Sequence, residues 1–343
     1  MMQKQKQTLF YSLIFLLVFF LMITIKLPYY VYKPGTADEL SSVVEVDSGF
    51  SSLGEFHLVT VSGGRATPLE YVLAKLSRFH ELVPIEEAIP ESFTDEQYRF
   101  YQQKMMDQSK VASQVVAYEA ANKEVTVTEK GVYVLHTIEG MPSEEKIETG
   151  DRIVKIDHID VYEPKDIIEY VQKKREKDEV VLEIERDNER IEIVLPITSF
   201  PEDPDRVGLG VQLLKDEAIN VDPQVEIKSG NIGGPSAGIM FALEIYNQLT
   251  ETDITKGYRI AGTGEIDVEG KVHRVGGIDK KVIAAHKKEI DFFLAPNEEG
   301  REGSNYEVAK DTAEKIKTDM EIVPIDSFQD ALDFLNQLEP KKD

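Results

Sequence analysis

The chain has 343 residues, which is enough for two compact domains and an appendage. Its net charge of -24, without a lysine- or arginine-rich stripe, excludes a typical nucleic-acid-binding protein, because phosphate binding needs a basic surface; peptides or small proteins are the expected partners. The sequence contains no cysteine, which excludes disulfides, thiolate metal sites and a thiol nucleophile. Alternating strand-like and helix-like segments predict a mixed α/β (α+β) fold.

An apolar segment near the N-terminus predicts a membrane anchor. Residues 9–25 carry no charge and approach the roughly 20 residues that cross a bilayer, so we expect a transmembrane helix over residues 9–27 after a cytoplasmic tail at residues 1–8. A cleaved signal peptide is the alternative, but its apolar core would be shorter and small residues would follow it, whereas the first alanine is Ala37. Tyrosines typical of a membrane interface follow the run, namely Tyr29, Tyr30 and Tyr32.

The lysines around this segment give only a weak indication of topology. Lys4 and Lys6 precede the apolar run, and Lys26 and Lys33 nearly balance them on the other side. A single-pass protein of the cell membrane with its acidic body outside the cytoplasm is therefore a hypothesis.

Residues 36–121 are predicted to form the N-terminal part of the larger body, which residues 205–338 complete. Residues 55–61 have the pattern of a strand, and residues 68–76 that of a short helix. A longer helix is expected to begin after Thr94, a good N-cap with Gln97 three residues later, and to continue through Tyr118.

Residues 122–200 have the pattern of a separate β-rich module. Short apolar segments surround one helix near residues 164–174, and turn signals occur at Gly140, Gly150-Asp151 and Asp187-Asn188. The pattern resembles a bacterial PDZ domain, which implies that an extended peptide adds as a strand to an open sheet edge. The segment shows no Gly-Leu-Gly-Phe carboxylate loop, so docking of an internal segment is an alternative to recognition of a free C-terminus; a domain that only spaces other parts is the other alternative. This module is expected to be inserted into the larger body.

Ser236 is the candidate nucleophile. It follows a strand at residues 225–227 and a glycine-rich stretch at residues 229–234, and it is expected to open a helix through residue 249. Backbone N–H groups at a helix N-terminus suit a developing oxyanion, and the small neighbours let a substrate backbone approach; these neighbours are Gly234, Ala237 and Gly238. The alternative is that Ser236 only caps a helix.

Lys281 is the candidate general base. In the helix after Gly276-Gly277, apolar residues recur at positions 278, 282 and 285, and Lys281 falls on this buried face. Burial favours the neutral amine and lowers its pKa toward the value that a base needs. The alternative is that its ammonium group reaches outward to solvent. Three other lysines are expected to be solvated charges, namely Lys280, Lys287 and Lys288.

Three motifs in order resemble the proteolytic domain of Lon-type serine-lysine peptidases, over about residues 205–338. They are Pro235-Ser236-Ala237-Gly238, Thr263-Gly264-Glu265 and Gly276-Gly277-Ile278-Asp279-Lys280-Lys281. The resemblance implies that Ser236 is the nucleophile, that Lys281 is the base and that Thr263 orients the lysine. One position departs from the family, because Gly233 stands where an acidic residue is common.

The whole arrangement resembles the membrane-anchored PDZ and Lon-like peptidases of Gram-positive bacteria. This resemblance implies an extracytoplasmic enzyme that cleaves small exported or membrane-tethered proteins. No complete phosphate-binding loop is present, since residues 264–272 have the wrong glycine spacing and lack the Ser/Thr after the lysine, so ATP independence is expected. We also expect no cofactor and no metal. Lon-type domains often form rings, so a homo-oligomer is among the expected assemblies.

Two other functions remain as alternatives. The segment Gly234-Pro235-Ser236-Ala237-Gly238 also matches the nucleophile elbow of α/β-hydrolases, for which His286 would be the base and Asp253, Asp267 or Asp279 the acid. The other alternative is a non-catalytic adaptor that is tethered to the membrane and binds peptides through its PDZ module.

Overall fold

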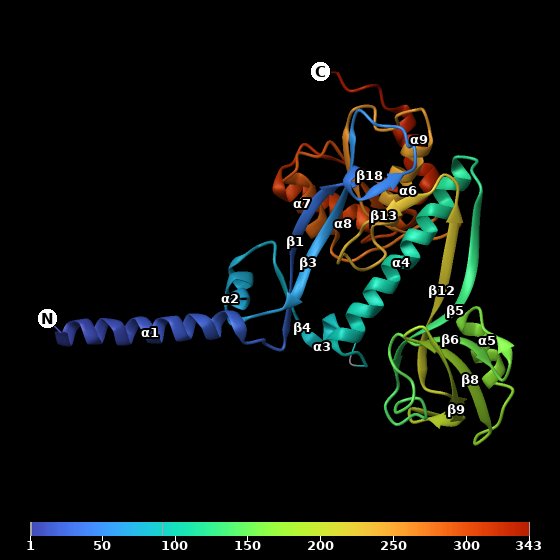
Figure 1. Cartoon of the computed structure of the whole chain (residues 1–343). Helices are drawn as coiled ribbons and strands as arrows, with labels where there is room; N and C mark the ends of the chain where they lie inside the picture. Colours follow the sequence, from blue (N-terminus) through green and yellow to red (C-terminus); the bar gives the residue numbers. More distant parts are fainter. Residues whose placement is uncertain (1, 91, 343) are drawn as a thin grey trace.

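Helix α1 (Met2–Thr24) extends away from the rest of the molecule (Figure 1). The computed structural model describes residues 2–90 and 92–342. The helix already includes most of the segment predicted as a tail, of which Met1 lies outside the described residues. Its part from Gln5 to Thr24 has a mean hydropathy of 2.1 and no buried residue, so α1 has the length and composition of a membrane span or a signal sequence.

The larger body is built on a six-stranded sheet in the order β18-β17-β14-β3-β1-β4. Strands β3, β14, β17 and β18 run parallel, whereas β1 pairs antiparallel with both β3 and β4. These strands come from both ends of the chain: β1 (Tyr29–Glu39), β3 (Glu55–Arg65), β4 (Glu81–Pro84), β14 (Arg259–Gly262), β17 (Phe292–Pro296) and β18 (Glu321–Ile325). The segment between β4 and β14 therefore includes an insertion into the sequence of this body.

Helices cover both faces of this sheet because its buried strands alternate between two apolar cores. On β3, Phe56 and Leu58 face one core, whereas Val59 faces the other. The first core is closed by α4 (Asp95–Ala120), α6 (Gly238–Leu249) and α9 (Phe328–Gln337), and the second by α7 (Ile278–His286) and α8 (Asn305–Ile316).

Short elements complete the body. They are the strand pairs β2 (Val44–Val46) with β13 (Val225–Ile227) and β15 (Glu265–Ile266) with β16 (Val272–His273), the helices α2 (Pro68–Leu76) and α3 (Ile85–Ala88), and the 3-10 turns η1 (Leu40–Ser42) and η2 (Glu298–Gly300).

The β-rich module is a separate domain with its own apolar core. Its sheet has the order β12-β5-β6-β8-β9, and Asp187 and Asn188, both with positive φ, form the tight turn between β8 and β9. Its elements are β5 (Val125–Thr137), β6 (Arg152–Ile156), β7 (Ile159–Asp160), α5 (Pro164–Val171), β8 (Glu179–Arg186), β9 (Glu189–Pro196), β10 (Thr198–Phe200), β11 (Asp203–Gly208) and β12 (Val211–Val221).

A long antiparallel ribbon joins this domain to the body. Strands β5 and β12 pair over almost their whole lengths, from Val125 opposite Val221 to Thr137 opposite Val211. The ribbon runs beside α4, which crosses between the two parts (Figure 1).

The predicted cap of one helix and the predicted bounds of another are confirmed. Thr94 caps α4 through a reciprocal pair of hydrogen bonds with Gln97, and α2 has the predicted bounds with a similar cap at Thr67. The prediction for Ser236 needs a correction, because α6 begins at Gly238 and Ser236 lies in the turn before it.

Candidate active site

Ser236 lies at the N-terminal end of α6, in the turn that follows the glycine-rich stretch. Its hydroxyl faces a cleft of about 800 Å³ whose walls come from β1, β3, α4 and the start of α7. Among the described residues, neither the N–H of Ser236 nor that of Ala237 has a hydrogen-bond acceptor. Both N–H groups are therefore available to an oxyanion at the positive end of the helix dipole.

Lys281 reaches Ser236 from the opposite wall of the cleft. Its side chain is 3% exposed, and its Nζ lies 2.8 Å from Ser236 Oγ and 2.8 Å from Thr263 Oγ1. The predicted burial of Lys281 is confirmed, and Ser236, Thr263 and Lys281, which the sequence separates by up to 45 positions, come together.

Thr263 connects the two other residues. Its hydroxyl donates to the backbone carbonyl of Ser236 at 2.8 Å, so its oxygen is left to accept an N–H of Lys281. Thr263 is itself 1% exposed. It therefore fixes both the lysine amine and the backbone of the serine.

Burial lowers the pKa of Lys281 from 10.5 to about 7. The cause is loss of hydration, which penalises the ammonium form. Near neutral pH a large fraction of Lys281 is the neutral amine, whose lone pair can accept the proton of Ser236. The arrangement is thus a serine nucleophile with an adjacent base that a third residue orients.

The three small residues predicted to serve the oxyanion or the substrate backbone have different surroundings. Gly234 and Ala237 line the cleft, but the N–H of Gly234 already donates to the carbonyl of Gln102 at 2.7 Å. Gly238 is not among the cleft-lining residues, and a Cβ there would lie 2.8 Å from Ile266 Cγ2, so this glycine permits the close packing of α6. The backbone N–H groups of Ser236 and Ala237 are therefore the candidate oxyanion donors.

Helix α4 holds the serine loop through contacts that the sequence analysis missed. Besides the Gln102 carbonyl, Ser109 Oγ donates to the carbonyl of Pro235 at 2.9 Å, and Ser113 Oγ donates to that of Gly238 at 2.8 Å. Ser109 and Ser113 are buried. The sequence feature that could have predicted these contacts is a pair of serines four positions apart, on the face of α4 that also carries Met106.

The expectation that Lys280 is a solvated charge is wrong. Lys280 is 4% exposed, and its Nζ lies 2.6 Å from a carboxylate oxygen of Glu81 on β4 and 3.1 Å from one of Asp279. Burial lowers the pKa of Lys280, but hydrogen bonding to Glu81 and the charge of Asp279 outweigh it, and the net pKa lies above its usual value. The charged Lys280 thus ties β4 to α7 at the cleft.

The β-rich domain has a groove of its own, of about 450 Å³, between α5 and the segment from β11 to β12. The segment Gly208-Leu209-Gly210-Val211 lines it, and this segment differs from Gly-Leu-Gly-Phe only at Val211. The expectation that no such loop exists is therefore wrong; the loop escaped notice because it follows the rest of the domain in sequence. The N–H groups of Leu209 and Gly210 have no acceptor among the described residues.

The hydrolase triad is not assembled. His286 is exposed at the end of α7, and among the described residues no hydrogen bond joins it to Ser236. The candidate acids have other partners: Asp253 binds Thr255, Asp267 binds His273 and Asp279 binds Lys280. Within the described part of the chain, no three His, Asp or Glu side chains form a group that could hold a metal ion.

Comparison with known proteins assigns both domains. The family model for the Lon protease (S16) C-terminal proteolytic domain matches residues 206–337, and that for the PDZ domain matches residues 122–197. A Lon protease of Campylobacter concisus is 32% identical over 156 residues, which cover 44% of this chain and 18% of that protein. A Lon protease of Campylobacter jejuni is 37% identical over 102 residues, which cover 29% of this chain and 12% of that protein.

The chain therefore spans less than a fifth of the length of these two relatives. Among solved structures, the PDZ domain of the SdrC-like protein of Listeria innocua is 26% identical, with a TM-score of 0.23, and the match covers 24% of this chain and 93% of that one. The two family models confirm both domain resemblances predicted from the sequence: residues 206–337 match a Lon proteolytic domain and residues 122–197 match a PDZ domain.

Proposed function

We propose that the protein is a membrane-anchored serine endopeptidase that works without ATP and cleaves small exported or membrane-tethered proteins outside the cytoplasm. Ser236 is its nucleophile, Lys281 its general base and Thr263 the residue that positions the base. One observation carries the proposal: a fully buried lysine amine lies within hydrogen-bonding distance of a serine hydroxyl at a helix N-terminus, in an open cleft.

The geometry supports acyl transfer in two steps. Neutral Lys281 removes the hydroxyl proton as Ser236 Oγ attacks the peptide carbonyl, and the oxyanion receives the N–H groups of Ser236 and Ala237. The C–N bond then breaks, and the proton passes from Lys281 to the departing amine. Water, deprotonated by the same amine, releases the acyl group and restores the serine.

The decisive experiment is cleavage of unstructured peptides by the full chain in lipid nanodiscs, with and without ATP. We expect cleavage independent of ATP and its loss in both Ser236→Ala and Lys281→Met. His286→Ala is the control for the triad alternative and keeps the wild-type rate. A wild-type chain that binds peptides but cleaves none would instead establish the adaptor.

The PDZ groove supports docking of a substrate terminus. The free N–H groups of Leu209 and Gly210 can receive a carboxylate while the substrate adds as a strand beside β12. Ile168 on α5 lines the groove and is 47% exposed, so Ile168→Asp alters the groove without loss of core packing. We expect this variant to lose affinity for a long substrate with a free C-terminus, but to cleave a short peptide at the wild-type rate.

The extracytoplasmic orientation is open to a direct test because the chain has no natural cysteine. Leu53, in the body, is 89% exposed, so a Leu53→Cys variant offers one accessible thiol. A membrane-impermeant maleimide applied to intact cells is expected to label it. Labelling only after cell lysis would place the body in the cytoplasm.

A further inference from the structure

Helix α2 presents an apolar face that no described residue covers. Val72, Leu73 and Leu76 lie on one side of this nine-residue helix, and Phe79 follows it; all four are exposed. Beyond α1, no other stretch of eight described residues exposes four large apolar side chains. Such a concentration on a soluble surface is unusual and marks a contact surface.

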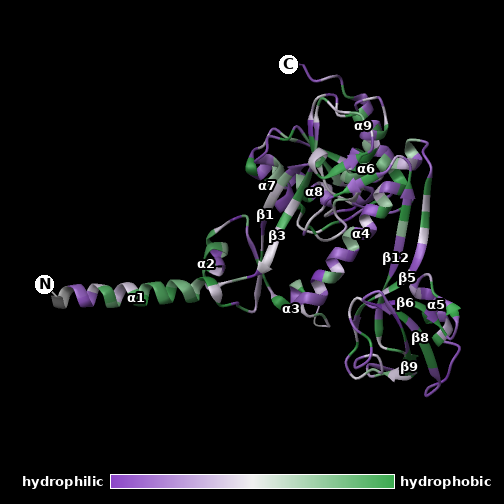
Figure 2. Cartoon of the chain, in the orientation of Figure 1, coloured by the Kyte–Doolittle hydropathy of each residue, from purple (hydrophilic) through white to green (hydrophobic). Residues whose placement is uncertain are grey.

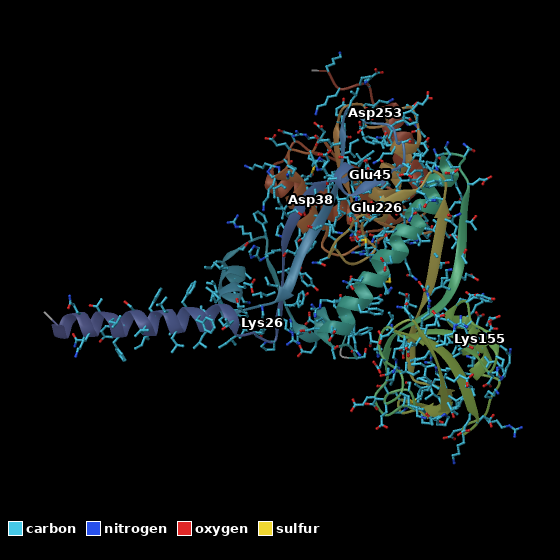
Figure 3. The ribbon with its side chains drawn as sticks, viewed as in Figure 1. Lys26, Asp38, Glu45, Lys155, Glu226 and Asp253 are labelled. Carbon is cyan, nitrogen blue, oxygen red and sulfur yellow. The ribbon has the colours of Figure 1, made fainter. Side chains whose placement is uncertain are left out.

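The location of this face indicates what covers it. Helix α2 contacts the end of α1, where the N–H of Leu27 donates to the carbonyl of Ala66 at 2.8 Å and Lys26 Nζ donates to that of Arg65 at 3.3 Å. Figure 2 shows α2 directly beside the end of the apolar α1, and Figure 3 places Lys26 where α1 meets the body. If α1 spans a bilayer, α2 therefore lies at the level of the bilayer surface.

The neighbouring side chains suit a membrane interface. Tyr29 at the start of β1 packs edge-on against Tyr71 of α2, with ring centroids 5.1 Å apart. Lys75 and Arg78, which alternate with the apolar residues, form no ion pair with any described residue. Tyrosines and long basic side chains with apolar stems are typical of the zone between lipid chains and water.

We infer that the face formed by Val72, Leu73, Leu76 and Phe79 inserts into the surface of the same bilayer that α1 spans. This inference rests on the proposed membrane anchoring. The body is then held at two points, by α1 and by α2, instead of moving freely on one helix.

The second attachment fixes the distance of the cleft from the membrane surface. Glu81, which lines the cleft, follows Phe79 by two residues, and Tyr32, its partner on β1 and also a cleft-lining residue, follows α1 by eight residues. Eight extended residues span at most about 26 Å. The cleft therefore begins close to the lipid, and it takes peptide bonds near the membrane surface, as in proteins tethered by a lipid or a single helix.

The test uses full-length single-cysteine variants in nanodiscs, each labelled with an environment-sensitive fluorophore. Leu73→Cys and Leu76→Cys report on the face, and Val268→Cys is the matched control, because Val268 is 46% exposed and Leu73 50%. Phe15→Cys, within α1, reports on the span itself. The quenchers are lipids with a spin label near the headgroup or deep in the acyl chain, and iodide in the water.

We expect the headgroup-level spin label to remove at least half of the emission at Leu73→Cys and Leu76→Cys, and to leave Val268→Cys unchanged. Quenching of the two α2 labels by iodide as strongly as that of Val268→Cys would overturn the inference. Protection from all quenchers would overturn it too, because a second copy or another protein would then cover the face. If Phe15→Cys is not quenched by the deep spin label, the anchoring proposal fails instead; no arm depends on peptidase activity.

Discussion

The N–H of Lys281 donates to the carbonyl of Gly277 at 3.1 Å, so the first turn of α7 determines where the candidate base lies. Gly277 has a φ of 65°, and a Cβ there would lie 2.8 Å from Val61 Cγ2. Gly276, by contrast, has no atom within 4 Å of such a Cβ and no positive φ. The two adjacent glycines therefore form a matched pair for testing how α7 supports catalysis.

Gly277→Ala is expected to destabilise the fold by about 1–2 kcal/mol, because a left-handed conformation is unfavourable for residues with a Cβ. Displacement of Lys281 should lower kcat/KM by roughly 10–100-fold. Gly276→Ala is the control for stability and should not change the free energy of unfolding measurably. Denaturant unfolding and peptide cleavage measure the two effects, and equal behaviour of the two variants would contradict this role of Gly277.

The pH dependence of cleavage should follow Lys281. Since burial lowers the pKa of this amine to about 7, the base is protonated and inactive below that pH and neutral above it. We expect kcat/KM to rise with pH through a midpoint near 7 and then to level off. A midpoint near the ordinary lysine value would show that Lys281 is not the titrating base.

The Thr263→Val variant should show how much catalysis depends on the positioning of Lys281 by Thr263. The change removes both the oxygen that accepts from Lys281 and the hydroxyl that donates to Ser236. Loss of a buried hydrogen bond costs about 1–3 kcal/mol, so kcat should fall by roughly 10–100-fold. The midpoint of the pH profile of kcat/KM should also shift, because Lys281 loses a hydrogen-bond partner. Thr263→Ser keeps the hydroxyl and should restore the rate to within a few-fold, together with the wild-type pH midpoint.

Glu244 makes stability depend on pH. It is buried on α6, where loss of hydration raises its pKa from 4.5 to about 7, while Gln248 donates to it at 2.6 Å. Because the folded pKa exceeds the unfolded one, the stability that the protonated carboxyl provides is complete below pH 4.5 and is lost as pH rises through about 7.

Glu244→Gln should therefore increase the free energy of unfolding at pH 8 by about 1–3 kcal/mol and flatten its decrease between pH 4.5 and 7. Denaturant unfolding at several pH values provides the measurement. Glu251→Gln, at an exposed position just beyond the same helix, should leave the curve unchanged. A destabilised Glu244→Gln protein at pH 8 would contradict the predicted direction.

Local signals accounted for much of the fold and for the burial of the candidate base. The caps at Thr67 and Thr94 depend on residues three positions apart, and the burial of Lys281 follows from helical periodicity over a single turn. The meeting of Ser236 with Lys281 came from the family motifs instead, since spacing alone does not bring two helix ends together.

Features that depend on distant partners were not predicted. Lys280 has the same local pattern as a solvated lysine, and only the distant Glu81 on β4 explains its burial. The hydrogen bond from Ser109 to the carbonyl of Pro235 likewise joins residues 126 positions apart. The ribbon of β5 and β12 was missed because its charged residues hide the strand pattern and its partners are 96 positions apart at one end, where Val125 pairs with Val221.

The pairing of β1 with β3, and of β3 with β14, has a consequence if α1 anchors the chain in a membrane as proposed. Only residues 25–28 separate α1 from β1, and in this segment the N–H of Leu27 donates a hydrogen bond to the carbonyl of Ala66. A cut by a second protease on the C-terminal side of β1 would separate this strand from the rest of the chain. The cleft would then lose Tyr32 and Asp38, which line it. With α1 as the proposed anchor, the intact form would resist release as a diffusible fragment, and its search for substrates would stay confined to two dimensions.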